Sequence, residues 1–180
     1  MTARDASRYI LDRVAKMLEE EGGPVGEAVK MIASAKRVFV YGVGRSGLVA
    51  RAFAMRLTQL GLDSFFIGET ITPIVKAGDL VVIVSNTGTT MSAVQTANIA
   101  RRVGARVLAV TGNRHSKLSQ AANLALTISE HRDARRSKFA PLGTLFETAA
   151  LVLLDGMVAD VMRDLGETEA TMRGRHAIMV

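Results

Sequence analysis

Hydrophobic positions along the chain follow two spacings, which predict helices at the start and then strands and helices in alternation. Apolar residues recur at the spacing of one helix face in five segments, residues 6–21, 25–32, 46–60, 91–103 and 143–165. Short runs rich in β-branched and apolar residues predict five strands, at residues 37–41, 64–67, 80–84, 106–110 and 124–128. Residues 166–180 are predicted to be a polar tail.

The order of these segments indicates an α/β fold. A strand followed by a helix and another strand usually pairs in parallel with it, and the run LVVIV at 80–84 is typical of a strand buried on both faces. We predict a three-layer α-β-α sandwich around a five-stranded parallel sheet in the flavodoxin-like order 2-1-3-4-5. Nothing resembling a linker or repeat divides the sequence, so we expect residues 1–180 to form one domain, with N-terminal helices over 1–35.

Ligands of such sheets bind beyond the carboxyl ends of the strands where the strand order switches, here the loops after the first and third strands. The first loop, GVGRSG at 42–47, matches the dinucleotide fingerprint G-x-G-x-x-G, and Glu69 follows where a ribose-binding acid could stand. A hydride-transfer enzyme usually needs a second domain for its substrate, and no residues remain for one. A tight strand-to-helix turn is therefore the favoured interpretation.

The second loop reads Ser85-Asn86-Thr87-Gly88-Thr89-Thr90 and precedes a predicted helix. Its four hydroxyls and one amide surround a helix N-terminus, whose free N–H groups and dipole favour an anion. A helix cap needs one hydroxyl only. The excess favours binding of a phosphate monoester without a metal ion.

Composition narrows the chemistry. Hydrophobic residues make up 48% and charged residues 22%, as in ordinary globular domains. The absence of Cys excludes disulfides, thiolate metal sites and a Cys nucleophile, and three His residues argue against a multi-His metal site. No apolar run approaches the roughly 18 residues that span a bilayer. We expect a soluble, cytoplasmic protein with no cofactor, no metal and no membrane partner.

The formal charge of +6 raises nucleic acid as a possible partner. However, Phe and Tyr total eight and most lie in apolar segments, which leaves few exposed rings for base stacking. The one local basic cluster also fits a solvated loop; it comprises Arg132, Arg135, Arg136 and Lys138. Attraction of small anions explains the charge equally well, so we expect no nucleic-acid partner.

The glycine turn and the Ser/Thr-rich loop together resemble the sugar isomerase (SIS) domain family. Residues 43–61, 68–73, 137–147 and 175–176 more closely resemble the 6-phospho-3-hexuloisomerase family within it. That resemblance implies conversion of a phosphorylated hexulose, D-arabino-hex-3-ulose 6-phosphate, into fructose 6-phosphate by a homotetramer with active sites at subunit interfaces. The family's loop reads S-G-S-G-x-T; Thr87 keeps a hydroxyl, and Asn86 tolerates the positive φ that glycine would supply.

Moving a carbonyl from C3 to C2 requires a base at C2 and return of a proton to C3. Glu147 is the candidate base, because its apolar neighbours Leu145 and Phe146 would strengthen its carboxylate as a base. From the residues alone, an exposed first-turn Glu stabilised by the helix dipole is slightly favoured, and the resemblance reverses that preference. The resemblance implies that His176, an acid–base group near neutral pH, reaches a neighbouring subunit's site from the tail 166–180.

Further residues complete the predicted site. Gly44, Arg45 and Ser46 belong to the glycine turn, where Arg45 would steer the substrate and Ser46 would cap the helix and touch the phosphate. The resemblance implies that Glu69 and Thr72 line the pocket. Two alternatives stay open: a module that senses a sugar phosphate without turning it over, and an isomerase of another phosphosugar, such as an aldose–ketose pair. The family's enzyme serves the ribulose monophosphate pathway, in formaldehyde fixation or pentose-phosphate supply.

Overall fold

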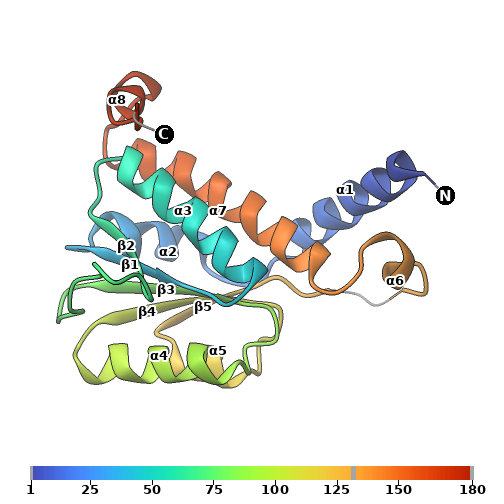
Figure 1. Ribbon diagram of the computed structural model, residues 1–180, viewed down its shortest axis with the longest axis horizontal. Coiled ribbons are helices and arrows are strands. Elements are labelled where there is room, and N and C mark those ends of the chain that lie inside the picture. The colour runs from blue at the N-terminus through green and yellow to red at the C-terminus, as the bar shows by residue number, and fades with distance from the viewer. Residues whose placement is uncertain (1, 131–132, 179–180) are drawn as a thin grey trace.

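The computed structural model of the protein describes residues 2–130 and 133–178. In these residues, parallel strands form one five-stranded sheet in the order β2-β1-β3-β4-β5 (Figure 1). The strands are β1 (Val38–Tyr41), β2 (Ser64–Phe66), β3 (Leu80–Ser85), β4 (Arg106–Thr111) and β5 (Leu124–Thr127). The predicted fold class and strand order are confirmed.

Helices cover both faces of the sheet: α2, α3 and α7 lie over one face, where α1 also packs on α7, and α4 and α5 lie over the other (Figure 1). The helices are α1 (Ala3–Glu19), α2 (Val25–Ala33), α3 (Arg45–Gln59), α4 (Met91–Arg102), α5 (Lys117–Ala121), α6 (Arg136–Phe139), α7 (Thr144–Asp164) and α8 (Glu169–Gly174). The hydrophobic spacing predicted α1 to α4 and α7, with ends displaced by a few residues.

Three short helices were not predicted, and one of them lies in the expected polar tail. Each of α5, α6 and α8 has six residues or fewer, which is too short to show a hydrophobic period. Capping side chains mark two of them: Ser116 accepts a hydrogen bond from the Ser119 amide before α5, and Thr168 accepts one from the Thr171 amide before α8.

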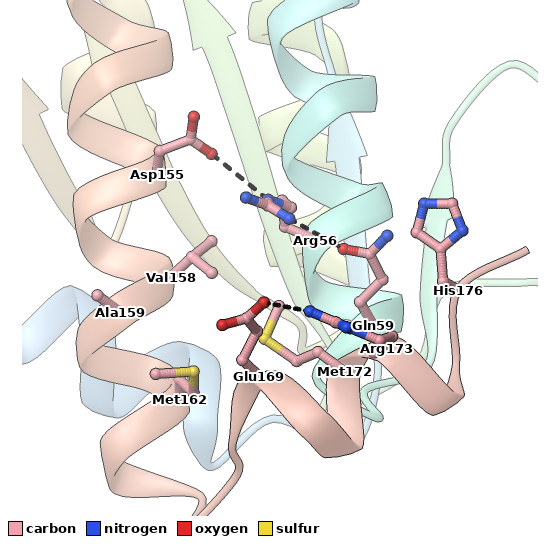
Figure 2. Close-up of a pocket in the computed structure, with 10 residues that line it drawn as sticks. All are labelled: Arg56, Gln59, Asp155, Val158, Ala159, Met162, Glu169, Met172, Arg173 and His176. Carbon is pink, nitrogen blue, oxygen red and sulfur yellow. Dashed lines mark hydrogen bonds and ion pairs between the residues drawn. The ribbon is translucent and has the colours of Figure 1, made fainter.

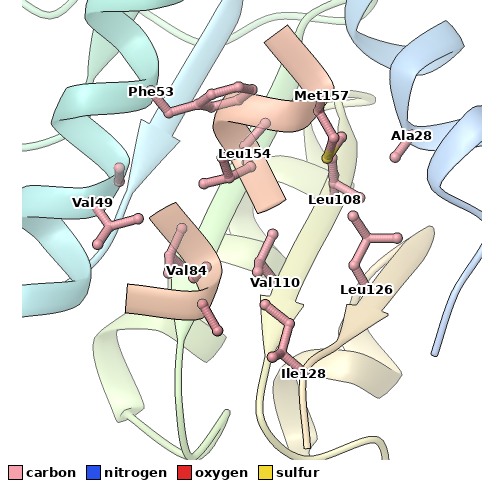
Figure 3. Close-up of a cluster of buried hydrophobic side chains, with 14 of the residues drawn as sticks. Ala28, Val49, Phe53, Val84, Leu108, Val110, Leu126, Ile128, Leu154 and Met157 are labelled. Carbon is pink, nitrogen blue, oxygen red and sulfur yellow. The ribbon is translucent and has the colours of Figure 1, made fainter. Parts of the chain in front are cut away.

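The buried side chains form two clusters, one on each face of the sheet. Alternate residues of β3 point to opposite faces, so Leu80, Val82 and Val84 join the larger cluster and Val81 and Ile83 the smaller. In the larger cluster, α3 and α7 pack on the sheet through side chains that include Val49, Phe53, Leu154 and Met157 (Figure 3). This packing holds the first turns of α3 and α7 close together.

The glycine turn between β1 and α3 has a steric origin. A β-carbon on Gly42 would lie 2.7 Å from the carbonyl carbon of Ser46, and one on Gly47 would lie 2.6 Å from the Gly42 oxygen. Gly44 has φ 59°, which other residues rarely adopt. The spacing G-x-G-x-x-G is thus accounted for by a close approach of backbone to backbone.

No helix in the described part of the chain is both long and apolar enough to cross a membrane.

Candidate active site

The two predicted loops meet at one small pocket of about 110 Å³. It is bordered by Val43, Ser46, Val84, Ser85, Asn86, Thr87, Thr90 and Ala93. The pocket lies where β1 and β3 end side by side, because β1 pairs with β2 on one edge and with β3 on the other. The switch point that the sequence indicated is therefore a real depression, with hydroxyl, amide and apolar side chains in its walls.

The N-terminus of α4 borders this pocket with its first-turn N–H groups free of a side-chain cap. Thr90 is the N-cap residue, but its side chain makes no capping bond to the helix. Instead, the Ser85 hydroxyl donates to Thr90 Oγ1 at 3.4 Å. Uncapped N–H groups and the positive end of the helix dipole favour an anion at this position.

Backbone hydrogen bonds from the residue after β4 and from α5 hold the Ser85–Thr90 loop in place. The Asn86 carbonyl accepts from the Gly112 amide at 2.9 Å, and the Gly88 carbonyl accepts from the Leu118 amide at 2.9 Å. Gly88 has φ 61°, and a β-carbon there would lie 2.8 Å from Thr111 Oγ1. The left-handed residue of the loop is Gly88 and not Asn86, so the expected tolerance of Asn86 for positive φ is not used.

Glu147 lies in the first turn of α7 and is 7% exposed, so the alternative of an exposed first-turn Glu is wrong. The Ser46 hydroxyl donates to its Oε1 at 3.2 Å, and Arg45 Nε lies 3.5 Å from its Oε2. Ser46 is 8% exposed, and it does not cap α3, whose N-cap residue is Gly44. The expected cap is therefore replaced by a bond that links the small pocket to a buried carboxylate.

One residue that the sequence reasoning missed shapes this carboxylate site. A β-carbon on Gly143 would lie 2.6 Å from Glu147 Oε1, so the carboxylate folds back over the glycine that precedes its own helix. The stretch 137–147 was noted only for its resemblance, and no local signal marks Gly143 as a contact of a side chain four residues later.

Glu69 and Thr72 lie elsewhere in the same chain, beside a separate pocket of about 360 Å³ along α3 and β2. Glu69 forms an ion pair with Arg51, whose guanidinium carbon stands 3.7 Å from the centre of the Phe66 ring. The Thr72 hydroxyl donates to the Phe66 carbonyl at 2.7 Å. Within one chain, these two residues do not border the small pocket.

His176 is exposed and borders a third pocket of about 480 Å³ between α3, α7 and α8 (Figure 2). Because α3 has 15 residues, its ends are about 22 Å apart at the standard helical rise. Ser46 contacts Glu147 at one end, whereas Gln59 borders the His176 pocket at the other. The two predicted catalytic residues of one chain therefore lie roughly 20 Å apart.

Arg175 anchors the segment that carries His176. Its guanidinium donates to both carboxylate oxygens of Glu167, at 2.8 and 3.0 Å, and to the Gln59 carbonyl at 3.1 Å. The hydrogen bonds from Arg175, followed by one from Thr171, lower the pKa of Glu167 from 4.5 to about 2. The ordered α8 segment thus rests on one well-bonded ion pair.

Two arginines of the predicted basic cluster contact other residues of the chain. Arg136 pairs with Glu130 and donates to the Leu142 carbonyl, while Arg135 stacks 5.3 Å from the centre of the Tyr9 ring. Arg136 also borders a pocket of about 550 Å³ that shares Asn86 and Thr87 with the small one. Lys138 is exposed. The other predicted member of the cluster, Arg132, lies outside the described residues, as does His131.

Within residues 2–130 and 133–178, no three His, Asp or Glu side chains gather so that they could hold a metal ion.

Comparison with known proteins gives three similarities that cover most of the chain. The SIS domain family model matches residues 31–154. A protein of Archaeoglobus fulgidus of uncharacterised function is 42% identical over 86% of this chain and 87% of its own. The 3-hexulose-6-phosphate isomerase of Methanocaldococcus jannaschii is 36% identical over 82% of this chain and 79% of its own.

One solved structure extends the similarity to three dimensions. The crystal structure of a Methanococcus jannaschii protein, from which a 3-hexulose-6-phosphate isomerase function was inferred, superposes with a TM-score of 0.83. It is 30% identical to this chain, and the match covers 94% of this chain and 98% of that one.

Proposed function

The chain belongs to the SIS domain family, and on that premise we propose that it is an isomerase that converts 3-hexulose 6-phosphate into fructose 6-phosphate. The observation that carries the proposal is the buried Glu147 carboxylate, joined through Ser46 to a pocket of hydroxyls at a helix N-terminus. The named relative from Methanocaldococcus jannaschii supports the choice of substrate.

The small pocket suits the phosphate of the substrate. The hydroxyls of Ser85, Thr87 and Thr90, the Asn86 amide and the first-turn N–H groups of α4 supply donors to its oxygens. Gly44 shapes the turn on the opposite wall. Ser46 borders this pocket and contacts Glu147, so the sugar carbons of a substrate whose phosphate is held here would extend toward Glu147.

Glu147 is the base of the reaction. Its carboxylate removes the C2 proton, the electron pair forms an enediol between C2 and C3, and a proton then returns to C3. The proton on O2 is lost as that on O3 is gained, so no redox partner is consumed. Arg45 faces Glu147 with a side chain that is 59% exposed, so its charge can also stabilise negative charge that develops on the enediol oxygens.

His176 acts from a neighbouring copy of the chain in this proposal. Its position near the far end of α3 keeps it from the Glu147 of its own chain, so a site that uses both residues needs a second subunit. Glu69 and Thr72 lie away from the small pocket of their own chain, so they too would border the site of a neighbouring subunit. We extend the proposal to a cytoplasmic homotetramer with shared sites.

The test is a coupled assay in which fructose 6-phosphate formed from 3-hexulose 6-phosphate is measured through reduction of a nicotinamide cofactor by added enzymes. Turnover should appear with the wild type and fall by several orders of magnitude in Glu147→Gln, which keeps the shape but removes the base. Arabinose 5-phosphate, an aldose phosphate, is the matched alternative substrate. Binding of both sugars with turnover of neither would favour a sensing module and overturn the proposal.

A further inference from the structure

The Ser46 hydroxyl lies between the two parts of the proposed site. It is 8% exposed, it borders the small pocket, and it donates to Glu147 Oε1 at 3.2 Å. Its backbone is held by the close approach of Gly42 and Gly47. The main chain is thereby fixed, while the hydroxyl retains rotation about one side-chain torsion.

A serine hydroxyl carries one proton to donate. That proton cannot serve the Glu147 carboxylate and a phosphate oxygen at the same time. In general, a hydrogen bond to the charged form of a carboxylate stabilises that form, and a carboxylate that loses such a bond is a stronger base.

We propose that Ser46 is a positioning residue that couples phosphate binding to activation of the base. When a sugar phosphate fills the small pocket, the hydroxyl turns from Glu147 to the phosphate, and the freed carboxylate becomes more basic beside C2 of the substrate. In this proposal, binding of the phosphate strengthens the base of the reaction. The inference rests on the proposed isomerase function and specifies how its site is controlled.

Two side chains of α3 contact the Glu147 carboxylate, the hydroxyl of Ser46 and the guanidinium of Arg45. Of these two, Ser46 also borders the small pocket. From α3, Arg45 Nε lies 3.5 Å from Glu147 Oε2. From α1, which packs on α7, the Tyr9 hydroxyl donates to Asp133 at 2.9 Å, and Arg13 Nε lies 4.0 Å from the same carboxylate. The helix α2 meets α7 through buried apolar side chains.

The test compares the acidic limbs of the pH profiles of kcat/KM and kcat, which report the free enzyme and the complex. Ser46→Ala removes the proton donor, and Ser85→Ala is the matched control, since Ser85 is an equally buried serine of the same pocket that bonds Thr90 and not Glu147. Relative to the wild type, the kcat/KM limb of Ser46→Ala should rise by roughly one pH unit, the size expected for the loss of one hydrogen bond to a charged group.

In Ser46→Ala, the kcat limb should stay in place, so that the two limbs move relative to each other. Ser85→Ala should raise KM but keep the wild-type separation. Ionisation of the substrate phosphate enters kcat/KM and not kcat, but it is the same for all three proteins, so each variant is compared with the wild type. No movement of the kcat/KM limb in Ser46→Ala, or equal movement of both limbs, would overturn the coupling.

A binding measurement separates this inference from the proposed function. Calorimetric titration with glucitol 6-phosphate, an unreactive hexitol phosphate, in two buffers of different ionisation enthalpy counts the protons taken up near pH 5. The wild type and Ser85→Ala should take up more protons than Ser46→Ala. Wild-type turnover without this difference would refute the coupling alone, whereas the absence of wild-type turnover would refute the isomerase.

Discussion

Oε1 of Glu147 lies 2.6 Å from the position that a β-carbon on Gly143 would occupy. The carboxylate therefore fills space that any other residue at position 143 would need. Gly143 has φ −87°, which every residue tolerates, so an alanine there would displace the carboxylate without straining the backbone.

We expect Gly143→Ala to lower kcat by roughly 100-fold, because a displacement of about 1 Å in a reacting group can cost that much. Thermal unfolding should change little. Gly156→Ala in the same helix is the control, since a β-carbon there meets nothing within 4 Å. It should keep its activity and gain about 1 kcal/mol of helix stability. Full activity in Gly143→Ala would show that the position of the carboxylate does not matter.

Gly88 holds the proposed phosphate loop against β4 and α5. In Gly88→Ala, the added carbon would meet Ser116 and Thr111, so the loop must move. We expect KM for the sugar phosphate to rise at least about tenfold, since charge-assisted hydrogen bonds are lost. Gly166→Ala is the matched control: its φ of 67° is equally left-handed, but its surroundings are open. Similar KM values in the two variants would argue against a phosphate site here.

The separation of Glu147 and His176 predicts complementation between inactive variants. Glu147→Gln and His176→Ala should each lose most of their activity. When the two are unfolded together and refolded as a mixture, roughly a quarter of wild-type activity should return, because half of the random pairs contain one intact shared site. Each variant refolded alone is the control. A mixture as inactive as its components would contradict a site shared between subunits.

The pairing of Glu167 with Arg175 predicts how the docking of α8 depends on pH. The pKa of Glu167 is lowered from 4.5 to about 2, so the ion pair contributes in full above about pH 4.5 and is lost as the pH falls through about 2. Amide hydrogen exchange in α8, corrected for its intrinsic pH dependence, should show protection that persists at pH 5 and disappears near pH 2.

Glu167→Gln should remove that protection at every pH. Glu169→Gln is the control, because Glu169 and its partner Arg173 are 84% and 79% exposed and such pairs contribute little. Unchanged protection of α8 in Glu167→Gln would mean that apolar contacts and not the ion pair hold the helix.

The sheet and its switch point could be predicted because the strands are short, mostly apolar runs that alternate with helical segments, and this pattern can be recognised without knowledge of tertiary contacts. The uniformly apolar run at residues 80–84 of β3, for example, could be read directly as a central strand. The same reasoning predicted that Ser46 caps a helix, because capping rules consider only residues that are close together in the sequence. Its actual partner, Glu147, lies 101 positions away.

Other features of the site depend on distances that no local pattern encodes. The placement of His176 beyond the far end of α3 follows from the length of that helix and from the bonds of Arg175 to Gln59 and Glu167. A polar tail gave no sign of these bonds. The constraint on Gly143 is equally hidden, because it arises from how a side chain folds back in three dimensions.

The length of α3 fixes the distance between the Glu147 contact at its first turn and the Arg175 contact at its last turn. One residue inserted between Ser46 and Gln59 would lengthen it by about 1.5 Å and rotate its ends by about 100° relative to each other. The hydroxyl could then no longer face Glu147 while Gln59 faces Arg175. Changes of chain length among relatives should therefore fall in the loops and spare this helix.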